Sequence, residues 1–246
     1  MGVLNVVYYN EMHSMLLPAI SLENNHTLQY NLDISRDGGA DWFFNVGKKF
    51  DCTHLTKPKD ISPKRSPQVV HTLLAWYFKG KDVVEAGTRV GDGLDCWARA
   101  TNSSTGMEID GRYCKAMITR AQSADYYPKF TMLCRSFFEG TPDADIYTFW
   151  AQPPHMTITR SFEHLALLYT QGKVRSNAEA VVLFEKGTAD DTEYARWAPA
   201  YASWSVSVHF DEFAACFAIP GPSRHLCRRA RGVFHIAAFP LRGLPV

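Results

Sequence analysis

The feature that most constrains the fold is the alternation of short apolar runs with helical segments, which begins at residue 66 and continues almost to the C-terminus. Seven runs are typical of buried strands, and most are followed by residues whose apolar positions recur every three or four places. This alternation predicts an α/β fold with a mostly parallel sheet and helices on both faces. The predicted strands are residues 82–86, 105–109, 130–134, 144–150, 180–184, 205–210 and 233–239.

The boundaries of several helices can also be read from the sequence. Ser66 and Pro67 are typical of an N-cap followed by proline at the first helical position, and Gly80 ends that helix. Further helices are predicted around residues 94–98, 113–121 and 162–169, and from residue 194, where Pro199 must bend or end the helix. Residues 211–231 contain Pro220-Gly221-Pro222 and no full helical pattern. The last strand is therefore predicted to be antiparallel.

Residues 1–65 lack this regularity. Turn-forming residues are dense there, as in Asn24-Asn25 and Asp37-Gly38-Gly39, and only residues 30–34 and 42–46 are candidate short strands. We expect an irregular N-terminal cap over residues 1–65, followed by the principal domain over residues 66–246.

Composition excludes several classes of protein. With 46% hydrophobic residues the chain is not disordered, and a net charge of +1 gives no electrostatic reason to expect nucleic acid as a partner. No apolar run approaches the roughly 18 residues of a membrane span, and the N-terminus lacks the basic start of a signal peptide. The six cysteines are scattered without a Cys-x-x-Cys pair, which argues against a disulfide framework and a zinc site. We therefore expect a cytoplasmic protein with no membrane or nucleic-acid partner.

Residues 82–97, DVVEAGTRVGDGLDCW, are the most informative about function. A predicted strand contains Glu85, and Gly87, Gly91 and Gly93 follow before a helix. Ligands of open parallel sheets bind beyond the carboxyl ends of the strands, where glycine lets the backbone approach closely. Glu108 follows at about the 20-residue spacing that places a carboxylate on ribose hydroxyls. These residues predict a nucleoside-binding site.

The patterns E-x-G-x-x-x-G-D-G and G-M-E-I-D resemble the first two motifs of class I S-adenosylmethionine-dependent methyltransferases. The resemblance extends over about residues 66–243, and it implies a Rossmann-like seven-stranded sheet and S-adenosylmethionine as the cofactor. It implies that the loop from Gly87 to Gly91 passes the amino-acid part of the cofactor. It also implies that Glu85 steers the ammonium group from beneath this loop and that Glu108 binds the ribose diol. The remaining cofactor-binding residues that it implies are Thr88, Gly93, Ile109, Ser136 and Phe137.

A nicotinamide-dinucleotide site is the competing interpretation of the same loop. Such a site requires glycine two positions after Gly87, where this chain has Arg89. A side chain at this position would partly block the close approach of a pyrophosphate. The cofactor of a methyltransferase carries no phosphate, so the loop favours the methyltransferase interpretation.

The segment after the fourth predicted strand, Trp150-Ala151-Gln152-Pro153-Pro154-His155, is expected to face the substrate. Some methyltransferases carry Asp/Asn-Pro-Pro-aromatic at this place, and Gln152 and His155 depart from both defining positions. We take Trp150, Gln152 and His155 as the candidate catalytic residues, with His155 as the general base if one is required. The alternative is a loop stiffened by proline in which Trp150 packs against the sheet.

Two other groups of charged residues have weaker indications of function. Asp143, Asp145, Asp190 and Asp191 do not show a pattern that requires a metal, and no metal site is predicted. An arginine cluster at residues 224–231 would either grip an anionic substrate or form a solvated loop.

We therefore predict a methyltransferase that acts on a small molecule or an exposed protein group. The alternatives are a catalytically inactive interaction module that binds S-adenosylmethionine and a dinucleotide-binding Rossmann protein.

Overall fold

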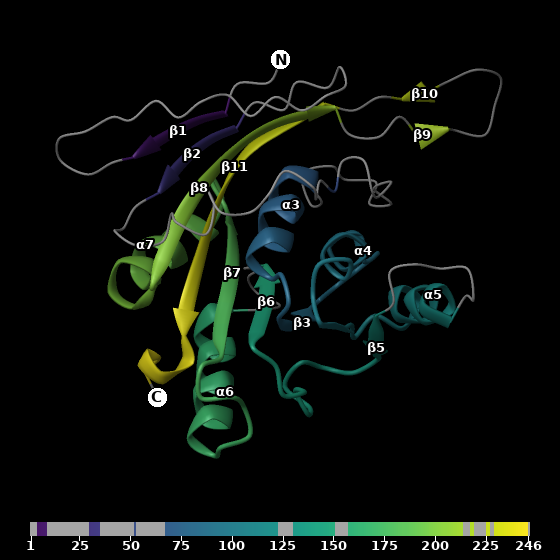
Figure 1. Ribbon diagram of the computed structural model, residues 1–246, viewed down its shortest axis with the longest axis vertical. Coiled ribbons are helices and arrows are strands. Elements are labelled where there is room, and N and C mark those ends of the chain that lie inside the picture. Colours follow the sequence, from purple (N-terminus) through teal and green to yellow (C-terminus); the bar gives the residue numbers. More distant parts are fainter. Residues whose placement is uncertain are drawn as a thin grey trace.

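The structure is a computed structural model that describes residues 4–8, 30–34, 52, 67–122, 130–150, 157–213, 217–218, 225–226 and 229–245. A nine-stranded sheet forms its centre, in the order β1-β2-β8-β11-β7-β6-β3-β4-β5 (Figure 1). The strands are β1 (Leu4–Tyr8), β2 (Tyr30–Ile34), β3 (Asp82–Ala86), β4 (Ser103–Met107), β5 (Thr131–Leu133), β6 (Ile146–Trp150), β7 (Glu179–Glu185), β8 (Trp204–Phe213) and β11 (Arg229–Pro240). A separate short pair joins β9 (Phe217–Ala218) to β10 (His225–Leu226).

All seven predicted strands form. The five strands from β5 to β7 in the sheet order pair in parallel, and β11 lies antiparallel between β7 and β8. The prediction of a mostly parallel Rossmann-like sheet with an antiparallel last strand is therefore confirmed. Because β8 and β11 are longer than predicted, Arg229 and Arg231 belong to β11 rather than to the connection. Arg224 and Arg228 lie outside the described residues.

The sheet also extends beyond the seven predicted strands. β1 and β2 pair in parallel, and β2 runs antiparallel along the outer edge of β8. The candidate strand at residues 30–34 is confirmed as β2, whereas the expectation of an irregular cap over residues 1–65 missed β1. A five-residue run does not reveal its partner, which here is the free edge of a strand that lies about 170 residues further along the chain. The candidate strand at residues 42–46 lies outside the described residues.

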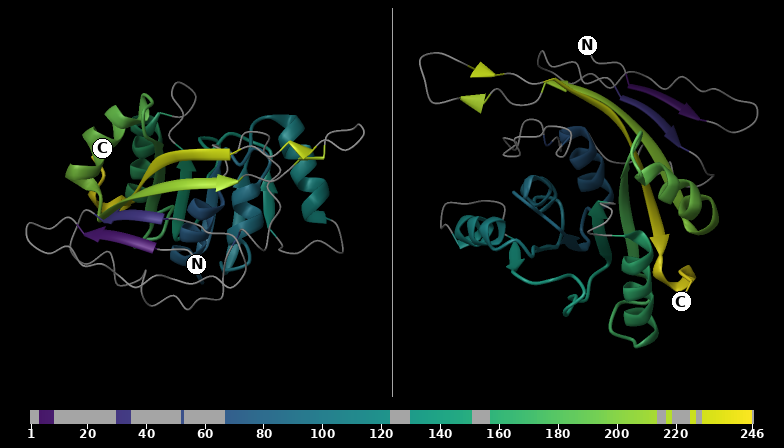
Figure 2. Two further views of the ribbon diagram at one scale, coloured as in Figure 1. Left: turned by 90° about the horizontal axis from the view of Figure 1, so that it is seen from above. Right: turned by 180° about the vertical axis from the view of Figure 1, so that it is seen from behind.

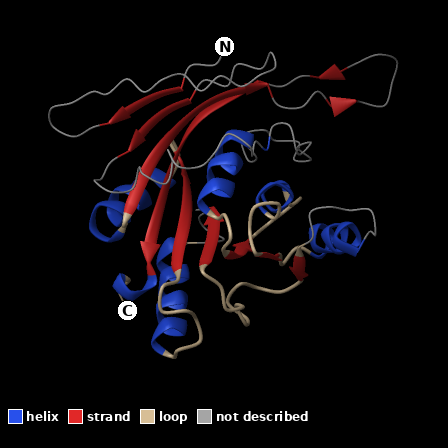
Figure 3. Ribbon diagram, viewed as in Figure 1, coloured by secondary structure: helices blue, strands red, loops and turns tan. Residues whose placement is uncertain are grey.

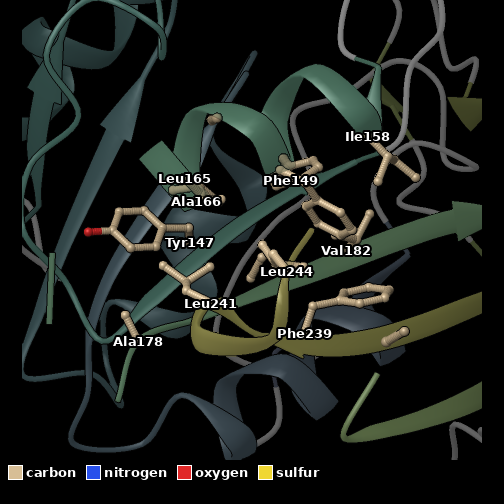
Figure 4. Packing of buried hydrophobic residues seen from close by; sticks show 14 of the residues in the cluster. Tyr147, Phe149, Ile158, Leu165, Ala166, Ala178, Val182, Phe239, Leu241 and Leu244 are labelled. Carbon is tan, nitrogen blue, oxygen red and sulfur yellow. The ribbon is translucent and has the colours of Figure 1, made fainter. Parts of the chain in front are cut away.

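Helices cover both faces of the sheet (Figures 2 and 3). They are α3 (Gln68–Tyr77), α4 (Asp92–Trp97), α5 (Gly111–Gln122), α6 (Ile158–Thr170) and α7 (Asp190–Tyr201), followed by the short 3₁₀ helix η2 (Leu241–Gly243). Helices α3 and α4 pack on one face around Trp97 and Phe78. Helices α6 and α7 pack on the other around Phe149, Phe162 and Phe239, part of which is drawn in Figure 4. Among the helices of the described residues, none is both long and apolar enough to span a bilayer.

Two disulfides contradict the prediction from cysteine spacing. Cys52 pairs with Cys96 on α4, and Cys114 on α5 pairs with Cys134 after β5, with Cα atoms 5.4 and 5.6 Å apart. The partners are 44 and 20 residues apart in sequence, so no local spacing signals them and only the fold brings them together. The cysteines therefore do not support the expectation of a cytoplasmic protein.

Candidate functional site

The loop between β3 and α4 takes a backbone conformation that glycine usually supplies. Gly87 and Gly91 have φ of 75° and 76°, and Arg89 between them has φ of 49°. Positive φ is uncommon for a residue with a side chain. The loop thus keeps a left-handed turn at the position where the dinucleotide pattern requires glycine, although this chain has arginine there.

The glycines of this loop serve different purposes. A Cβ on Gly87 would meet no atom within 4 Å, and Gly87 lines a cleft. A Cβ on Gly91 would overlap the side chain of Met117 from α5, and one on Gly93 would overlap Trp97. The space at Gly91 is therefore taken by Met117, whereas the sequence analysis assigned it to the cofactor. Of the three, Gly87 is the glycine whose backbone is open to a ligand.

The cleft lies at the carboxyl ends of β3, β4 and β5 and has a volume of about 210 Å³. This is smaller than the roughly 300–1,000 Å³ of typical ligand pockets, so a nucleoside cofactor would extend beyond it. Six predicted site residues line it: Gly87, Glu108, Ile109, Ser136, Phe137 and Trp150. The sequence analysis missed five other lining residues: Ala86, Arg89, Met107, Arg135 and Phe138.

Glu108 is fixed at the end of β4 by the backbone around it. One carboxylate oxygen accepts a hydrogen bond from the backbone N–H of Arg89 at 2.7 Å, and the other accepts from that of Asp110 at 2.9 Å. Each carboxylate oxygen has two lone pairs, so both oxygens can accept a further hydrogen bond. The carboxylate is thus oriented before any ligand arrives. It also ties the glycine loop to the neighbouring strand.

Glu85 lies beneath the loop and is 4% exposed. Its Oε2 atom is buried and has no hydrogen-bond partner among the described residues. Burial, followed by the nearby carboxylates of Glu108, Asp92 and Asp95, raises the pKa of Glu85 to about 8. The neighbouring carboxylates make the surroundings of Glu85 negative, and its Oε2 atom lacks a hydrogen-bond donor. Both properties favour a cationic N–H group, which would stabilise the ionised form of Glu85.

The buried acids have a histidine neighbour that was assigned no role from the sequence. His71 on α3 is 2% exposed, its Nδ1 atom has no hydrogen-bond partner among the described residues, and its ring packs edge-on to Trp97. Burial lowers the pKa of His71 to about 4, against the opposing effect of Asp92 and Asp95. The imidazole is therefore neutral at physiological pH and does not neutralise Glu85.

The lining beyond β5 includes two phenylalanines. Phe137 is 5% exposed and contacts the rings of Phe138 and Phe149, while Ile109, which also lines the cleft, is 77% exposed. These apolar side chains offer a surface for a planar ring. Trp150 lines the same cleft and packs edge-on against Phe234, with ring centroids 4.8 Å apart. The expected packing against the sheet is therefore present, and a catalytic role for Trp150 stays a prediction. Gln152 and His155 lie outside the described residues.

The carboxylates weighed as metal ligands have other partners. Asp143 and Asp145 both pair with Arg175, at 3.3 and 2.8 Å, close to the amino ends of β3 and β6. Asp190 accepts a hydrogen bond from the backbone N–H of Glu185, and Asp191 accepts one from that of Gly187. Asp143 and Asp145 thus lie at the opposite end of the sheet from the cleft. Asp190 and Asp191 fix the start of α7.

Comparisons with known proteins identify the fold. No protein-family model and no curated protein sequence matches the chain. Among solved structures, the C-terminal domain of precorrin-6Y C5,15-methyltransferase from Rhodobacter capsulatus matches with a TM-score of 0.52 and 8% identity, over 78% of this chain and 98% of that one. Precorrin-6y C5,15-methyltransferase from Geobacter metallireducens matches with a TM-score of 0.50 and 11% identity, over 78% and 97%. A proposed RNA methyltransferase from Pyrococcus horikoshii matches with a TM-score of 0.50 and 12% identity, over 77% and 93%.

These likenesses define the class of fold. The chain has the Rossmann-like fold of class I S-adenosylmethionine-dependent methyltransferases, and the resemblance drawn from the sequence is confirmed at this level. At identities of 8–12% the likeness extends to the fold alone. The activity of this chain must be argued from its own cleft.

Proposed function

We propose that the chain binds S-adenosylmethionine in this cleft and transfers its methyl group to a substrate. The observation that carries the proposal is the pair of carboxylates at the carboxyl ends of β3 and β4. Glu85 is buried without a donor for Oε2, and Glu108 is held by two backbone N–H groups with lone pairs to spare. An amino group and a ribose diol would supply the donors that this pair of carboxylates can accept.

Each part of the cleft has a task in this proposal. Glu85, which is buried behind the residues that line the cleft, accepts from the ammonium group of the cofactor. Glu108 accepts from the ribose hydroxyls, and Gly87 leaves room for the aliphatic part of the cofactor between them. Ile109, Phe137 and Ser136 hold the adenine ring. When bound, the cofactor supplies a methyl group on a positively charged sulfonium.

The protein needs to orient the methyl acceptor and exclude water, which are the main contributions to an in-line displacement. Trp150 forms the apolar wall of the cleft on the side of β6, where it shields the reacting atoms. Gln152 and His155 lie in the segment that follows Trp150 in the sequence, and both remain our candidates for contact with the acceptor. His155 would take the proton of the acceptor where one must leave.

The test is the affinity for S-adenosylhomocysteine, measured by calorimetry. We expect Glu108→Ala to weaken binding by about 1.5–3 kcal/mol, the range for hydrogen bonds to a charged group. Glu163→Gln, an exposed acid on α6 outside the cleft, is the control and should bind like the wild type. Since Glu108 also anchors the loop, thermal unfolding must show that the variant is folded.

Four results would contradict the proposal or support one of its alternatives. A wild-type chain that fails to bind S-adenosylhomocysteine, or a folded Glu108→Ala variant with unchanged affinity, contradicts the cofactor assignment. Micromolar binding of NAD would favour the dinucleotide interpretation instead. Binding without turnover of labelled cofactor in any extract would support the inactive module.

A further inference from the structure

The rim of the cleft carries positive charge that the proposed cofactor does not explain. Arg89 and Arg135 both line the cleft, where Glu108 is the only acidic residue among the described residues that line it. S-adenosylmethionine is itself a net cation, and the carboxylates of Glu85 and Glu108 offset only part of its charge together with that of the two arginines. An anionic second ligand would neutralise the remainder. The arginines of the rim therefore indicate that the second ligand of the site, the methyl acceptor, is an anion.

Arg135 lies beside the backbone of Gly140 and has no carboxylate partner among the described residues. It follows β5, is exposed, and its guanidinium lies against Gly140, where an added Cβ would be 3.4 Å from both Cζ and Nη1. Gly140 has φ of 98°, so its conformation also favours glycine. The segment from Cys134 to Gly140 thus turns back on itself and leaves room for this guanidinium at the rim.

Arg160 is held on the same segment from the other side. It lies in the first turn of α6, is exposed, and its guanidinium carbon is 4.1 Å from the centre of the Phe138 ring. Phe138 lines the cleft. Within the described part of the chain, neither Arg135 nor Arg160 has an acidic side chain within 4 Å, whereas Arg112, Arg120 and Arg175 all do.

We propose that Arg135 and Arg160 bind phosphate of the methyl-accepting substrate, and that this substrate is a nucleotide unit. The inference rests on the proposed function and adds the class of substrate. A guanidinium fork matches the oxygens of phosphate with two parallel hydrogen bonds, and packing against Gly140 and Phe138 orients both forks in advance. Trp150 lines the same cleft and supplies an aromatic ring on which a nucleobase can stack.

A phosphate of this kind has two sources, a free nucleotide and a single strand of RNA. We expect the strand, because Arg135 after β5 and Arg160 on α6 are two separate guanidinium groups, and a strand offers more than one phosphate to bind. The sequence analysis excluded nucleic acid from the net charge of +1. The net charge of the whole chain does not report how arginines are distributed over its surface. It therefore does not exclude nucleic acid as a partner.

The test uses the full chain saturated with S-adenosylhomocysteine, so that nucleotides cannot enter the cofactor site. Binding of a fluorescein-labelled single-stranded oligoribonucleotide is followed by anisotropy at several salt concentrations. We expect Arg160→Gln and Arg135→Gln each to lower the slope of log K against log salt by about 0.7, and the double variant to weaken binding about tenfold or more. Arg242→Gln is the matched control, because Arg242 is exposed on η2 at the amino ends of the parallel strands.

The outcomes separate this proposal from the proposed function. Binding of nucleoside monophosphates but not of the strand, with the same loss in the double variant, supports the phosphate site with a free nucleotide as its ligand. Intact binding of S-adenosylhomocysteine with neither nucleotide nor strand bound overturns this proposal alone. Strand binding that the double variant and Arg242→Gln alter equally also overturns it. A chain that does not bind S-adenosylhomocysteine refutes the proposed function first.

Discussion

The backbone of Gly87 forms one wall of the cleft, so a side chain at this residue would enter the space proposed for the cofactor. We expect Gly87→Val to reduce the affinity for S-adenosylhomocysteine by at least about 100-fold, because its Cβ meets no protein atom and would instead meet the ligand. The readout is calorimetry together with thermal unfolding. The strain of a valine at φ of 75° will lower stability as well.

Gly172 provides a matched control for that strain. It has φ of 65°, an added Cβ there would also meet no atom, and it follows the end of α6 away from the cleft. Gly172→Val should therefore lose similar stability and keep its affinity. Equal affinity in the two variants would show that the glycine loop is a structural turn only.

The sequence identified some residues of the candidate site and missed others. Glu85 and Glu108 were identified because they lie at the ends of successive predicted strands at a spacing that suits a nucleoside, and because the family resemblance gives both a role. Arg135 and Phe138 were missed, because the residues after β5 have no periodicity and only the turn at Gly140 places them at the rim. Arg89 was noted only as a departure from glycine, while its backbone hydrogen bond to Glu108 depends on the folded loop.

Among the elements, α5 holds the glycine loop in place. Met117 fills the space beside Gly91, and Arg120 donates a hydrogen bond to the carbonyl of Val90 at 2.9 Å. The disulfide from Cys114 on this helix reaches Cys134, directly before the cleft wall. It therefore joins the helix that supports the loop to β5, an edge strand of three residues.

Removing this link should loosen the edge of the sheet that forms the cleft. We expect Cys114→Ser with Cys134→Ser to lower the free energy of unfolding by about 3 kcal/mol, the loop-closure value for a disulfide that spans about 20 residues. Denaturant unfolding measures the loss. Mapping of alkylated cysteines in the unfolded, unreduced wild type provides the check, since labelling of both residues would contradict the disulfide.

The elements themselves were predicted to the extent that each is specified locally. The strands from β3 to β7 contain their own apolar runs, so they were found within two or three residues. The long β8–β11 hairpin was underestimated, because its distal residues, such as Asp211, Glu212 and Arg229, are polar and are strand only through pairing with each other. β1 and β2 depend likewise on the free edge of β8, which no local pattern reveals.

For the whole molecule, the buried groups under the glycine loop predict how stability depends on pH. Between its ordinary value of 4.5 and its raised pKa of about 8, Glu85 holds a proton in the folded state that the unfolded state has lost, so stability falls as pH rises. His71 acts in the opposite sense. Between its lowered pKa of about 4 and its ordinary 6.5, the unfolded state binds the extra proton, so stability rises with pH.

These two effects offset each other between about pH 4.5 and 6.5, and only the effect of Glu85 remains from 6.5 to 8. The free energy of unfolding of the ligand-free chain should therefore fall by up to about 1.4 kcal/mol per pH unit across that upper range. Glu85→Gln should remove this fall, and the difference between the two curves isolates Glu85 from every other titrating group.

Saturation with S-adenosylhomocysteine should reduce the fall in the wild type, because an ammonium group beside Glu85 stabilises its ionised form. For the same reason, binding should tighten as pH rises toward 8. Denaturant unfolding of both chains at half-unit steps from pH 6 to 8.5 is the measurement. Parallel curves for wild type and Glu85→Gln would show that this carboxyl is not held protonated, and the electrostatic basis of the proposed ammonium site would be lost.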